Sequence, residues 1–288
     1  MVKAQGKVVI HWHRRDLRIA DNTALAWASR RYERVIPCYV LSTWRGEHRW
    51  TGPKRQQFLC DCLASLEKNL KTIHGRLILL QGSAVEALGE LVRESGASAI
   101  CFNRDPDPFG KGVEAELEAA CEKWGIECHG FDDVTVHRAD EVLTQSGDPY
   151  RVYTPYSKNW LSLEKPEPAA KPKRLDTPAD LRSESIPDVS HWGLDKPCGK
   201  IIEAGERAAR NRLKKAVNTR LTGYAEDRDK PSVDGTSRLS QDLRWGLLSP
   251  RTVYWKAEEA RLQASAKSTR DGCFTFIKEL AWREFYMA

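Results

Sequence analysis

Short apolar runs alternate with helix-period stretches over the first 131 residues, and this alternation constrains the fold more than any other feature. Buried parallel strands have this appearance in a sequence, whereas half-exposed antiparallel strands alternate polar and apolar residues. We therefore predict a doubly wound α/β domain with a five-stranded parallel sheet. The predicted strands are Val8–Trp12, Val35–Leu41, Leu77–Leu80, Ala99–Phe102 and, more weakly, Ile126–Phe131. The clearest predicted helices are Pro53–Lys71, Ala84–Ser95 and Gly112–Trp124.

Periodicity fades after this region and returns near the end of the chain. Residues 132–199 are predicted to form an interdomain linker, because 166–173 is rich in proline and charge. An aromatic island at Pro149–Trp160 is expected to be a loop segment packed against a domain. Helical signal resumes at Ile201, and Gly205–Val217 reads as a basic amphipathic helix. We thus expect an α/β domain over 1–131 and the first part of an all-α domain over 200–288.

Composition restricts the class of protein. With 41% apolar and 30% charged residues the chain fits a soluble globular protein, and no apolar run approaches the roughly 18 residues of a membrane span. No signal peptide is visible, so we expect a cytoplasmic, nucleoid-associated protein, or a nuclear one in a eukaryote. None of the eight cysteines has metal-site spacing, and Cys38 and Cys101 lie in apolar runs. We therefore expect buried thiols, no zinc site and no structural disulfides.

The net charge of +6 is concentrated in the last third of the chain. From Lys200 to Ala288 there are 18 Lys and Arg against 12 Asp and Glu, so the preceding residues hold 28 of each. An excess of basic residues in one region is expected where a protein meets phosphates. A solvated basic face is the alternative explanation.

A cluster of arginines follows the first predicted strand. The sequence from residue 12 reads Trp-His-Arg-Arg-Asp-Leu-Arg-Ile-Ala-Asp-Asn. In an α/β sheet ligands bind beyond the carboxyl ends of the strands, where this loop would lie, although no G-x-G-x-x-G marks a dinucleotide site. Asp21 or Asn22 would cap the next helix. The structural alternative is a loop held by ion pairs.

A hydroxyl-rich turn occurs further on, at Asp234-Gly235-Thr236-Ser237-Arg238-Leu239-Ser240. Glycine permits a tight turn, and hydroxyls with backbone N–H groups at the start of a helix suit a phosphate or pyrophosphate. Taken alone, the pattern is also that of an ordinary Ser/Thr helix cap.

The last predicted helix carries polar groups at helical spacing. Glu279, Trp282 and Arg283 share one face, so a carboxylate, a flat aromatic surface and a cation lie within reach of one ligand. The other apolar residues are explained as packing residues, namely Phe274, Ile277, Leu280, Ala281 and Phe285. The chain stops two residues after Tyr286 without a capping residue, so we expect a larger protein whose remaining residues are absent.

Together these segments closely resemble the photolyase/cryptochrome family. The order W-x-R-x-D-L-R-x-x-D-N at residue 12 resembles its N-terminal signature, and Tyr224 with the Thr-Ser-x-Leu-Ser run resembles its flavin-binding segment. The terminal helix resembles its substrate-facing helix. Among subfamilies, Gly-Thr-Ser-Arg-Leu-Ser looks most like class I cyclobutane pyrimidine dimer photolyases.

The resemblance implies FAD as cofactor and UV-damaged DNA as partner. It implies that Glu279 hydrogen-bonds the damaged bases and Trp282 stacks on them as the catalytic pair, while Arg228 grips the DNA backbone and Tyr286 lines the lesion cavity. Phe276 receives no special role. The implied FAD contacts are Tyr224, Thr236, Ser237, Arg238, Leu239, Ser240 and Arg283.

An antenna pigment is also implied by the resemblance. Arg55, Asp105, Asp107 and Arg244 match positions that hold this pigment in some members. Its identity stays open between 8-hydroxy-5-deazaflavin and 5,10-methenyltetrahydrofolate, and an empty site is a further alternative.

The implied function is deoxyribodipyrimidine photo-lyase, a monomeric flavoprotein that transfers an electron from reduced FAD to pyrimidine dimers under blue light. The family's helical domain is much longer than the 89 residues that follow Gly199. We therefore expect this chain by itself to bind FAD poorly and to repair little, because half a domain buries too little surface. The alternatives are a cryptochrome-like photoreceptor and a residual, non-catalytic DNA- or nucleotide-binding fragment.

Overall fold

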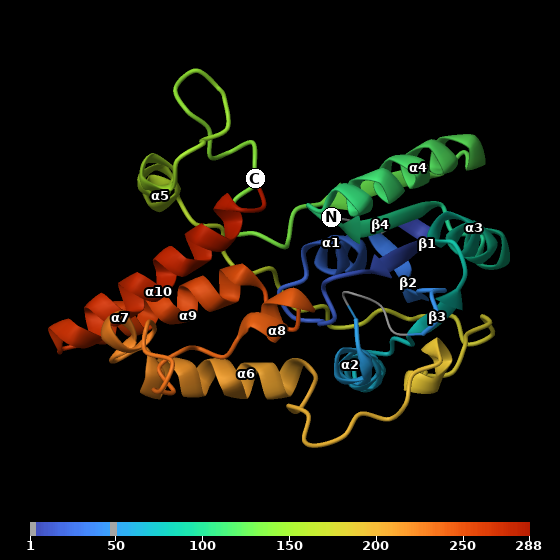
Figure 1. Ribbon diagram of the computed structural model, residues 1–288. Coiled ribbons are helices and arrows are strands. Elements are labelled where there is room, and N and C mark those ends of the chain that lie inside the picture. Colours follow the sequence, from blue (N-terminus) through green and yellow to red (C-terminus); the bar gives the residue numbers. More distant parts are fainter. Residues whose placement is uncertain (1–3, 47–50) are drawn as a thin grey trace. The chain divides into compact units, whose positions relative to one another are not determined.

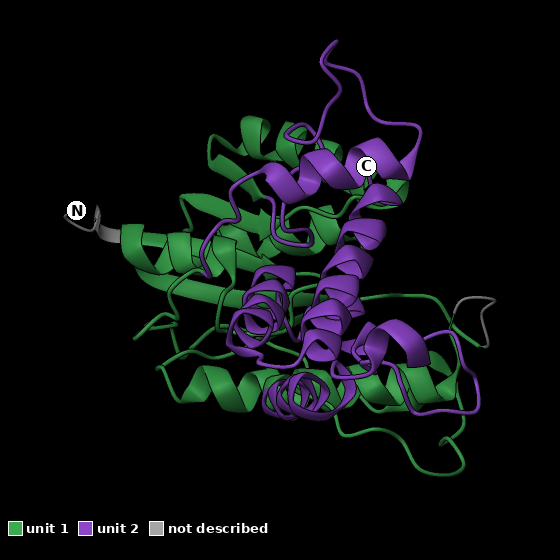
Figure 2. Cartoon of the chain, turned by 90° about the vertical axis from the view of Figure 1, so that its left-hand side faces the viewer, with its two compact units in different colours: residues 1–131, 169–206 green, residues 132–168, 207–288 purple. Residues whose placement is uncertain are grey.

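The computed structural model describes residues 4–46 and 51–288 (Figure 1). The chain forms two compact units, which Figure 2 colours separately. Unit 1 comprises residues 1–131 and 169–206, and unit 2 comprises residues 132–168 and 207–288. The segment 132–199, which the sequence analysis treats as a linker, is therefore divided, and each part packs within one unit.

A five-stranded parallel sheet forms the centre of unit 1, as predicted. The strand order is β3-β2-β1-β4-β5, so β1 is the central strand and pairs with both β2 and β4. Every pairing between these strands is parallel. The strands are β1 Ala4–His13, β2 Tyr32–Leu41, β3 Ile78–Gln81, β4 Ala99–Asn103 and β5 Glu127–Phe131.

The helices between the strands begin and end where the local sequence predicts. They are α1 Thr23–Arg31, α2 Pro53–Lys71, α3 Ala84–Ser95 and α4 Pro108–Trp124. Asn22, one of the two predicted caps, accepts a hydrogen bond from the Leu25 backbone N–H at 3.0 Å. Helices α3 and α4 end at Gly96 and Gly125, both in the left-handed conformation that glycine adopts without strain.

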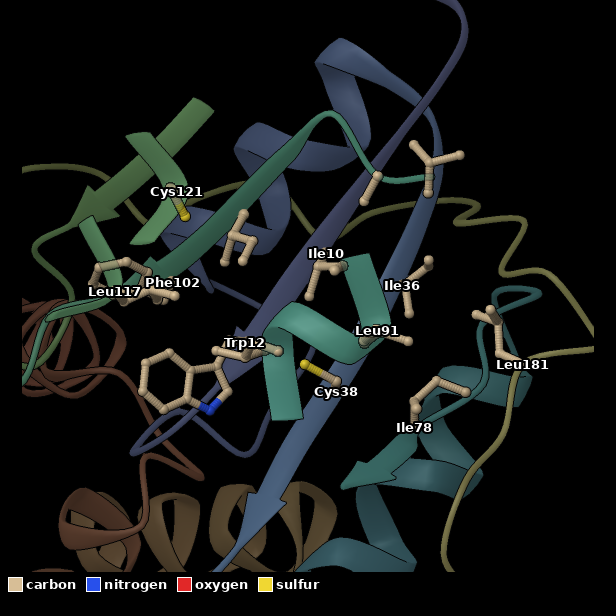
Figure 3. Close-up of a cluster of buried hydrophobic side chains, with 14 residues drawn as sticks. Ile10, Trp12, Ile36, Cys38, Ile78, Leu91, Phe102, Leu117, Cys121 and Leu181 are labelled. Carbon is tan, nitrogen blue, oxygen red and sulfur yellow. The ribbon is translucent and has the colours of Figure 1, made fainter. Parts of the chain in front are cut away.

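The two faces of the sheet bury different residues. On one face Ile10, Trp12, Ile36 and Phe102 pack with apolar side chains of α3 and α4, including Leu91 (Figure 3). Residues of opposite parity in β1 point to the other face, where helix α1 contacts the strands. A strand covered on both sides must be apolar throughout, which explains the continuous apolar runs in the sequence.

The segment 169–206 extends unit 1 at the sheet edge. Leu175 bridges β2 and the end of α2, because its carbonyl accepts from Val35 N and its N–H donates to the Ile73 carbonyl. Glu184 N donates to the Leu79 carbonyl on β3. The 3-10 helix η1 Val189–Trp192 buries the Trp192 indole, whose Nε1 donates to the Ser42 hydroxyl at 3.0 Å.

Unit 2 is helical. Its elements are α5 Tyr153–Ser162, α6 Glu206–Lys215, the π-helical turn η2 Ala216–Arg220, α7 Tyr224–Asp227, α8 Ser240–Arg244, α9 Pro250–Gln263 and α10 Lys267–Phe285. Helix α6 confirms the predicted basic helix in position. Helix α10 is the centre of the unit and contacts α5, α7 and α9. The aromatic island is packed, as predicted, but it is a helix rather than a loop.

Helix α5 forms because tertiary burial outweighs its weak sequence signal. Pro155 occupies the third helical position, where a missing N–H costs no internal hydrogen bond. Burial of Tyr156 and Trp160 on one side then stabilises the helix. Among the described residues, none of the helices combines the length and the apolar character needed to cross a membrane.

Candidate functional site

Helix α10 supplies the side chains on which the predicted site depends. Ile277, Leu280 and Ala281 are buried, which confirms their expected packing role. Phe274 was also expected to pack but is 40% exposed, because the helix side that it occupies is not covered by another element there. Phe276 is buried and packs edge-on against Tyr224 at 5.4 Å between ring centres.

An ion pair joins α10 to α7 at the position of the predicted lesion contacts. The Glu279 carboxylate accepts a hydrogen bond from the Arg228 guanidinium. The two side chains are 35% and 32% exposed, so solvent and ligands reach both. The pair holds a carboxylate and a guanidinium in one orientation at the surface without burying either charge.

An aromatic stack lies one helical turn further along α10. The Trp282 ring stacks on Tyr153 of α5 at 3.4 Å between ring centres with an interplanar angle of 10°. On Trp282 a second, looser stack is formed by Tyr286, at 5.6 Å and 19°. Tyr286 is 78% exposed, and the Tyr153 hydroxyl is fixed by donating to the Lys278 carbonyl at 2.8 Å. The stack offers a rigid, partly exposed aromatic surface.

A buried carboxylate anchors the same helix on its other side. Glu284 accepts hydrogen bonds from Val136 N, from His137 N and from the Trp160 indole at 2.6 Å. Burial raises the pKa of Glu284 to about 7. Burial likewise lowers the pKa of the nearby Lys165 to about 8. The end of α10 is therefore fixed by polar contacts to the segment that follows β5.

The side chain of Arg283 takes part in the same anchoring. Its Nη1 donates to the Val134 carbonyl at 2.6 Å. The three residues predicted to share one face thus have separate partners in unit 2: Glu279 pairs with Arg228, Trp282 stacks on Tyr153, and Arg283 contacts the backbone of residue 134. The predicted flavin contact of Arg283 stays a prediction.

The hydroxyl-rich turn packs against α7. A Cβ atom added to Gly235 would lie 2.4 Å from the Asp227 Cβ, so only glycine permits this approach. Leu239 is buried, whereas Thr236 and Ser240 are exposed. Helix α8 has Leu239 as its first cap residue and no side-chain cap, so the hydroxyls do not serve as an ordinary helix cap.

The backbone of the turn has one left-handed residue that is not glycine. Arg238 has a φ of 59°, a conformation that costs energy for residues with a Cβ. Its guanidinium is tied to Asp234 at 3.0 Å, and Asp234 also pairs with Arg220. The turn and the Glu279–Arg228 pair both contact α7, which also carries the buried Tyr224. Helix α7 therefore joins two parts of the predicted site.

The predicted antenna residues are less closely associated. Asp105 and Asp107 are both bound by Arg15 Nη1, at 2.7 and 3.1 Å. Arg55 is exposed in the first turn of α2. Arg244 is exposed on α8 of unit 2, so the structure groups only the two aspartates directly.

The arginines that follow β1 have partners within unit 1. Arg14 pairs with Glu114 of α4, and Arg18 Nη2 donates to the Asp21 carbonyl at 2.5 Å. Together with Arg15, all three are engaged in the fold, which is the structural alternative stated for this loop. Glu206 supports the loop by accepting from Ile19 N and Ala20 N.

Two groups of residues were missed by the sequence analysis. Tyr153 belongs to the aromatic island, and nothing in the sequence places it on Trp282. His11, His13 and Asp16 lie together at the end of β1, with ligand atoms within 4.8 Å of one another. The spacing His-x-His-x-x-Asp was a usable signal, but only cysteine-containing patterns were weighed for metal sites.

Comparison with known proteins identifies the family. The sequence profile of the family described as DNA photolyase matches residues 9–173, which is more than half of the chain. The chain therefore belongs to the DNA photolyase family. A deoxyribodipyrimidine photo-lyase of Synechococcus is 32% identical over 96% of this chain and 59% of its own length. The crystal structure of a class III photolyase from Agrobacterium tumefaciens superposes with a TM-score of 0.87 at 32% identity, over 99% of this chain and 59% of that one.

The chain spans about 59% of the length of these relatives. A protein of similar length is also known: an uncharacterised 31.6 kDa protein of another Synechococcus strain is 31% identical over 96% of this chain and 98% of its own length. The match to a class III enzyme means that family membership leaves the class undecided. The class I assignment stays a prediction.

Proposed function

We propose that this chain carries the antenna domain and the lesion-facing part of the catalytic domain of a class I deoxyribodipyrimidine photo-lyase. Its substrate would be a cyclobutane pyrimidine dimer in DNA, bound by a monomer. The family relationship supports the reaction class, and the run Gly235–Ser240 supports class I. The observation that carries the proposal is the exposed Glu279–Arg228 pair on the same helix as the Trp282 stack.

These side chains suit a base extruded from a duplex. An enzyme that acts on a base inside DNA must take it out of the stack, and a dimer pairs poorly, which lowers this cost. Trp282 would stack on the extruded bases, since base–aromatic stacking contributes about 1–3 kcal/mol per base. Glu279 would accept hydrogen bonds from the polar edge of the bases. Arg228 would contact a neighbouring phosphate, where its charge replaces counterions.

The residues present fit one end of FAD. Thr236 and Ser240 expose hydroxyls on a turn in which Gly235 removes a Cβ, so a phosphate can approach the backbone closely. The residues that would hold the nucleotide are Tyr224, Thr236, Ser237, Arg238, Leu239 and Ser240, with Arg283 nearer the flavin. Reduced FAD, when bound, supplies the electron for dimer cleavage. Tyr224 and Leu239 would position the turn through their burial.

For the antenna, we propose a pigment held at the carboxyl end of the sheet by Arg55, Asp105 and Asp107, with Arg244. The Arg15 bridge already holds the two aspartates in a defined arrangement. Deazaflavin and folate differ in absorption, so the pigment extracted from purified protein would distinguish them.

The test is binding of a duplex oligonucleotide that contains one thymine dimer, compared with the same duplex undamaged. We expect Glu279→Gln and Trp282→Leu each to lower the preference for the damaged duplex about tenfold or more, which corresponds to about 1.4 kcal/mol. The matched controls are Glu259→Gln and Trp255→Phe on α9, which are not part of the proposed site. Equal loss in the controls, or no preference in the wild-type chain, would contradict the proposal.

Light provides the second part of the test. With FAD and a reductant added, damaged duplex should be repaired only under blue light, and only to a small extent by this chain alone. Damage-specific binding without any light-dependent repair, even when flavin is bound stoichiometrically, would favour the cryptochrome-like or non-catalytic alternatives.

A further inference from the structure

Three metal-ligating side chains meet at the carboxyl end of β1, apart from the proposed DNA and flavin site. His11 and His13 are two positions apart on the strand and therefore point to the same face of the sheet. Asp16 follows in the loop and turns back toward them. All three side chains are at most 1% exposed. One ligand atom from each lies within 4.8 Å of the others.

The separations match those between the ligands of one small cation. His11 Nε2 lies 3.5 Å from Asp16 Oδ2, and His13 Nδ1 lies 3.6 Å from Asp16 Oδ1. Around a tetrahedral Zn²⁺ with bonds of about 2.0–2.1 Å, neighbouring ligand atoms are about 3.4 Å apart. The three side chains therefore need to move by only a few tenths of an ångström to share an ion.

The carboxylate is oriented by an outer layer of hydrogen bonds. Asp16 Oδ2 accepts from Asn22 Nδ2 at 2.8 Å and from Asn103 Nδ2 at 2.6 Å. The other oxygen, Oδ1, accepts from Arg14 N at 2.7 Å. A carboxylate oxygen has two lone pairs, so Oδ1 keeps one for a metal. Hydrogen bonds of this kind hold the ligands of established metal sites in position.

The histidines are oriented in a corresponding way. His11 Nδ1 lies 3.7 Å from Cys101 Sγ, and this thiol donates to the Ala24 carbonyl at 3.8 Å. In the tautomer in which Nδ1–H donates to the sulfur, the His11 Nε2 lone pair faces the carboxylate. His13 Nδ1 also lies 3.1 Å from the Asp16 backbone oxygen. Nitrogen and oxygen lone pairs that face one another away from water require a cation between them.

We propose that His11, His13 and Asp16 bind a divalent first-row transition metal, with Zn²⁺ as the expected ion. Two imidazoles and one carboxylate are a ligand set that zinc accepts, and a water completes the tetrahedron. Because the site is buried, the metal acts on structure: it ties the loop after β1 to the strand. That loop also carries Arg14, Arg15 and Arg18, so the metal would hold these arginines in place.

The test is a titration of the chelator-treated 288-residue chain with Co²⁺. We expect saturation at one equivalent, the intense visible absorption of tetrahedral cobalt, and its loss when Zn²⁺ is added. Zn²⁺ should also raise the midpoint of thermal unfolding, because it binds the folded state alone. His11→Gln and His13→Gln should remove the cobalt spectrum. His129→Gln should retain it, since His129 pairs with Glu127 on β5, away from the cluster.

Several results would overturn the proposal. They are the absence of a saturable tetrahedral cobalt spectrum in the wild-type chain, an unchanged spectrum in folded His13→Gln, and loss of the spectrum in His129→Gln. A thermal midpoint that depends on pH across the imidazole range, but not on Zn²⁺, would show that a proton is the cation. If the histidine variants do not fold, the wild-type titration and the His129→Gln control still decide.

Discussion

At the scale of single residues, unit 2 combines exposed charges with deeply buried ones, and the two behave differently. The Glu279–Arg228 pair is one-third exposed, so its contribution to stability is small and its charges stay available to a ligand. Glu284 is 3% exposed, and loss of its three hydrogen-bond donors would leave a buried charge. We expect the first group to affect binding and the second to affect folding.

The pKa of Glu284 predicts a pH-dependent stability. Folding raises this pKa from 4.5 to about 7, so the folded chain binds the proton more tightly than the unfolded chain. The stabilising contribution is complete below about pH 4.5 and is lost as the pH rises through about 7, which amounts to about 3 kcal/mol. Urea unfolding between pH 5 and pH 8 should show a flatter profile for Glu284→Gln. The exposed control Glu259→Gln should keep the wild-type slope, and a parallel slope in Glu284→Gln would contradict the prediction.

The stack of Tyr153 on Trp282 predicts different results for two substitutions. Tyr153→Phe keeps the ring and loses only the hydrogen bond to the Lys278 carbonyl, at a cost of about 1 kcal/mol. Tyr153→Ala removes the ring and should cost about 3 kcal/mol. Urea unfolding measures both. If the two variants lost the same stability, the ring contact would contribute nothing beyond the hydroxyl.

At the scale of elements, α10 is positioned by close contact of its backbone with the segment that precedes α7. A Cβ added to Gly272 would lie 1.9 Å from the Leu221 carbonyl oxygen, whereas a Cβ added to Gly112 in α4 would meet nothing within 4 Å. Glycine normally weakens a helix by about 1 kcal/mol relative to alanine. At position 272 that cost is offset by the close packing it permits, and at position 112 it is not.

These two glycines give a matched pair of substitutions. Gly112→Ala should stabilise the chain by about 0.5–1 kcal/mol, since α4 gains helix propensity without a clash. Gly272→Ala should destabilise it by about 2 kcal/mol, because a backbone atom must move. Thermal or urea unfolding checks both signs. A stabilising effect of Gly272→Ala would show that α10 and the Leu221 segment separate easily.

At the scale of the whole molecule, the chain contains the complete α/β sheet but spans only about 59% of the length of its photolyase relatives. In unit 2 the hydroxyl-rich turn is largely exposed, with Leu239 as its buried anchor. A ligand held by an exposed turn gains little from burial, which is the term that usually dominates cofactor affinity.

We therefore expect the purified 288-residue chain to carry FAD at well below one equivalent. Flavin absorbance after gel filtration in excess FAD measures this directly. Thr236→Ala together with Ser237→Ala should lower the remaining binding further, whereas Thr252→Ala on α9 should not. Stoichiometric FAD retained through gel filtration would show that these residues suffice for a closed site.

The sequence by itself determined the elements whose burial pattern is local. Five strands, their parallel arrangement and helices such as Pro53–Lys71 and Ala84–Ser95 could be predicted, because strands buried on both faces are apolar throughout and caps act within a few residues. The residues of α10 that face a ligand were also indicated by spacing alone. Helix α5 was not, since its stability comes from burial of Tyr156 and Trp160.

Contacts between distant residues were decided only by the tertiary structure. The stack of Tyr153 on Trp282, the pairing of Arg228 with Glu279, and the anchoring of Glu284 by Trp160 join residues that are 51 to 129 positions apart. Nothing local encodes such pairs, because their free energy arises from packing and desolvation in the folded state. The same holds for Asp16, whose position between His11 and His13 depends on how the loop after β1 turns back on its strand.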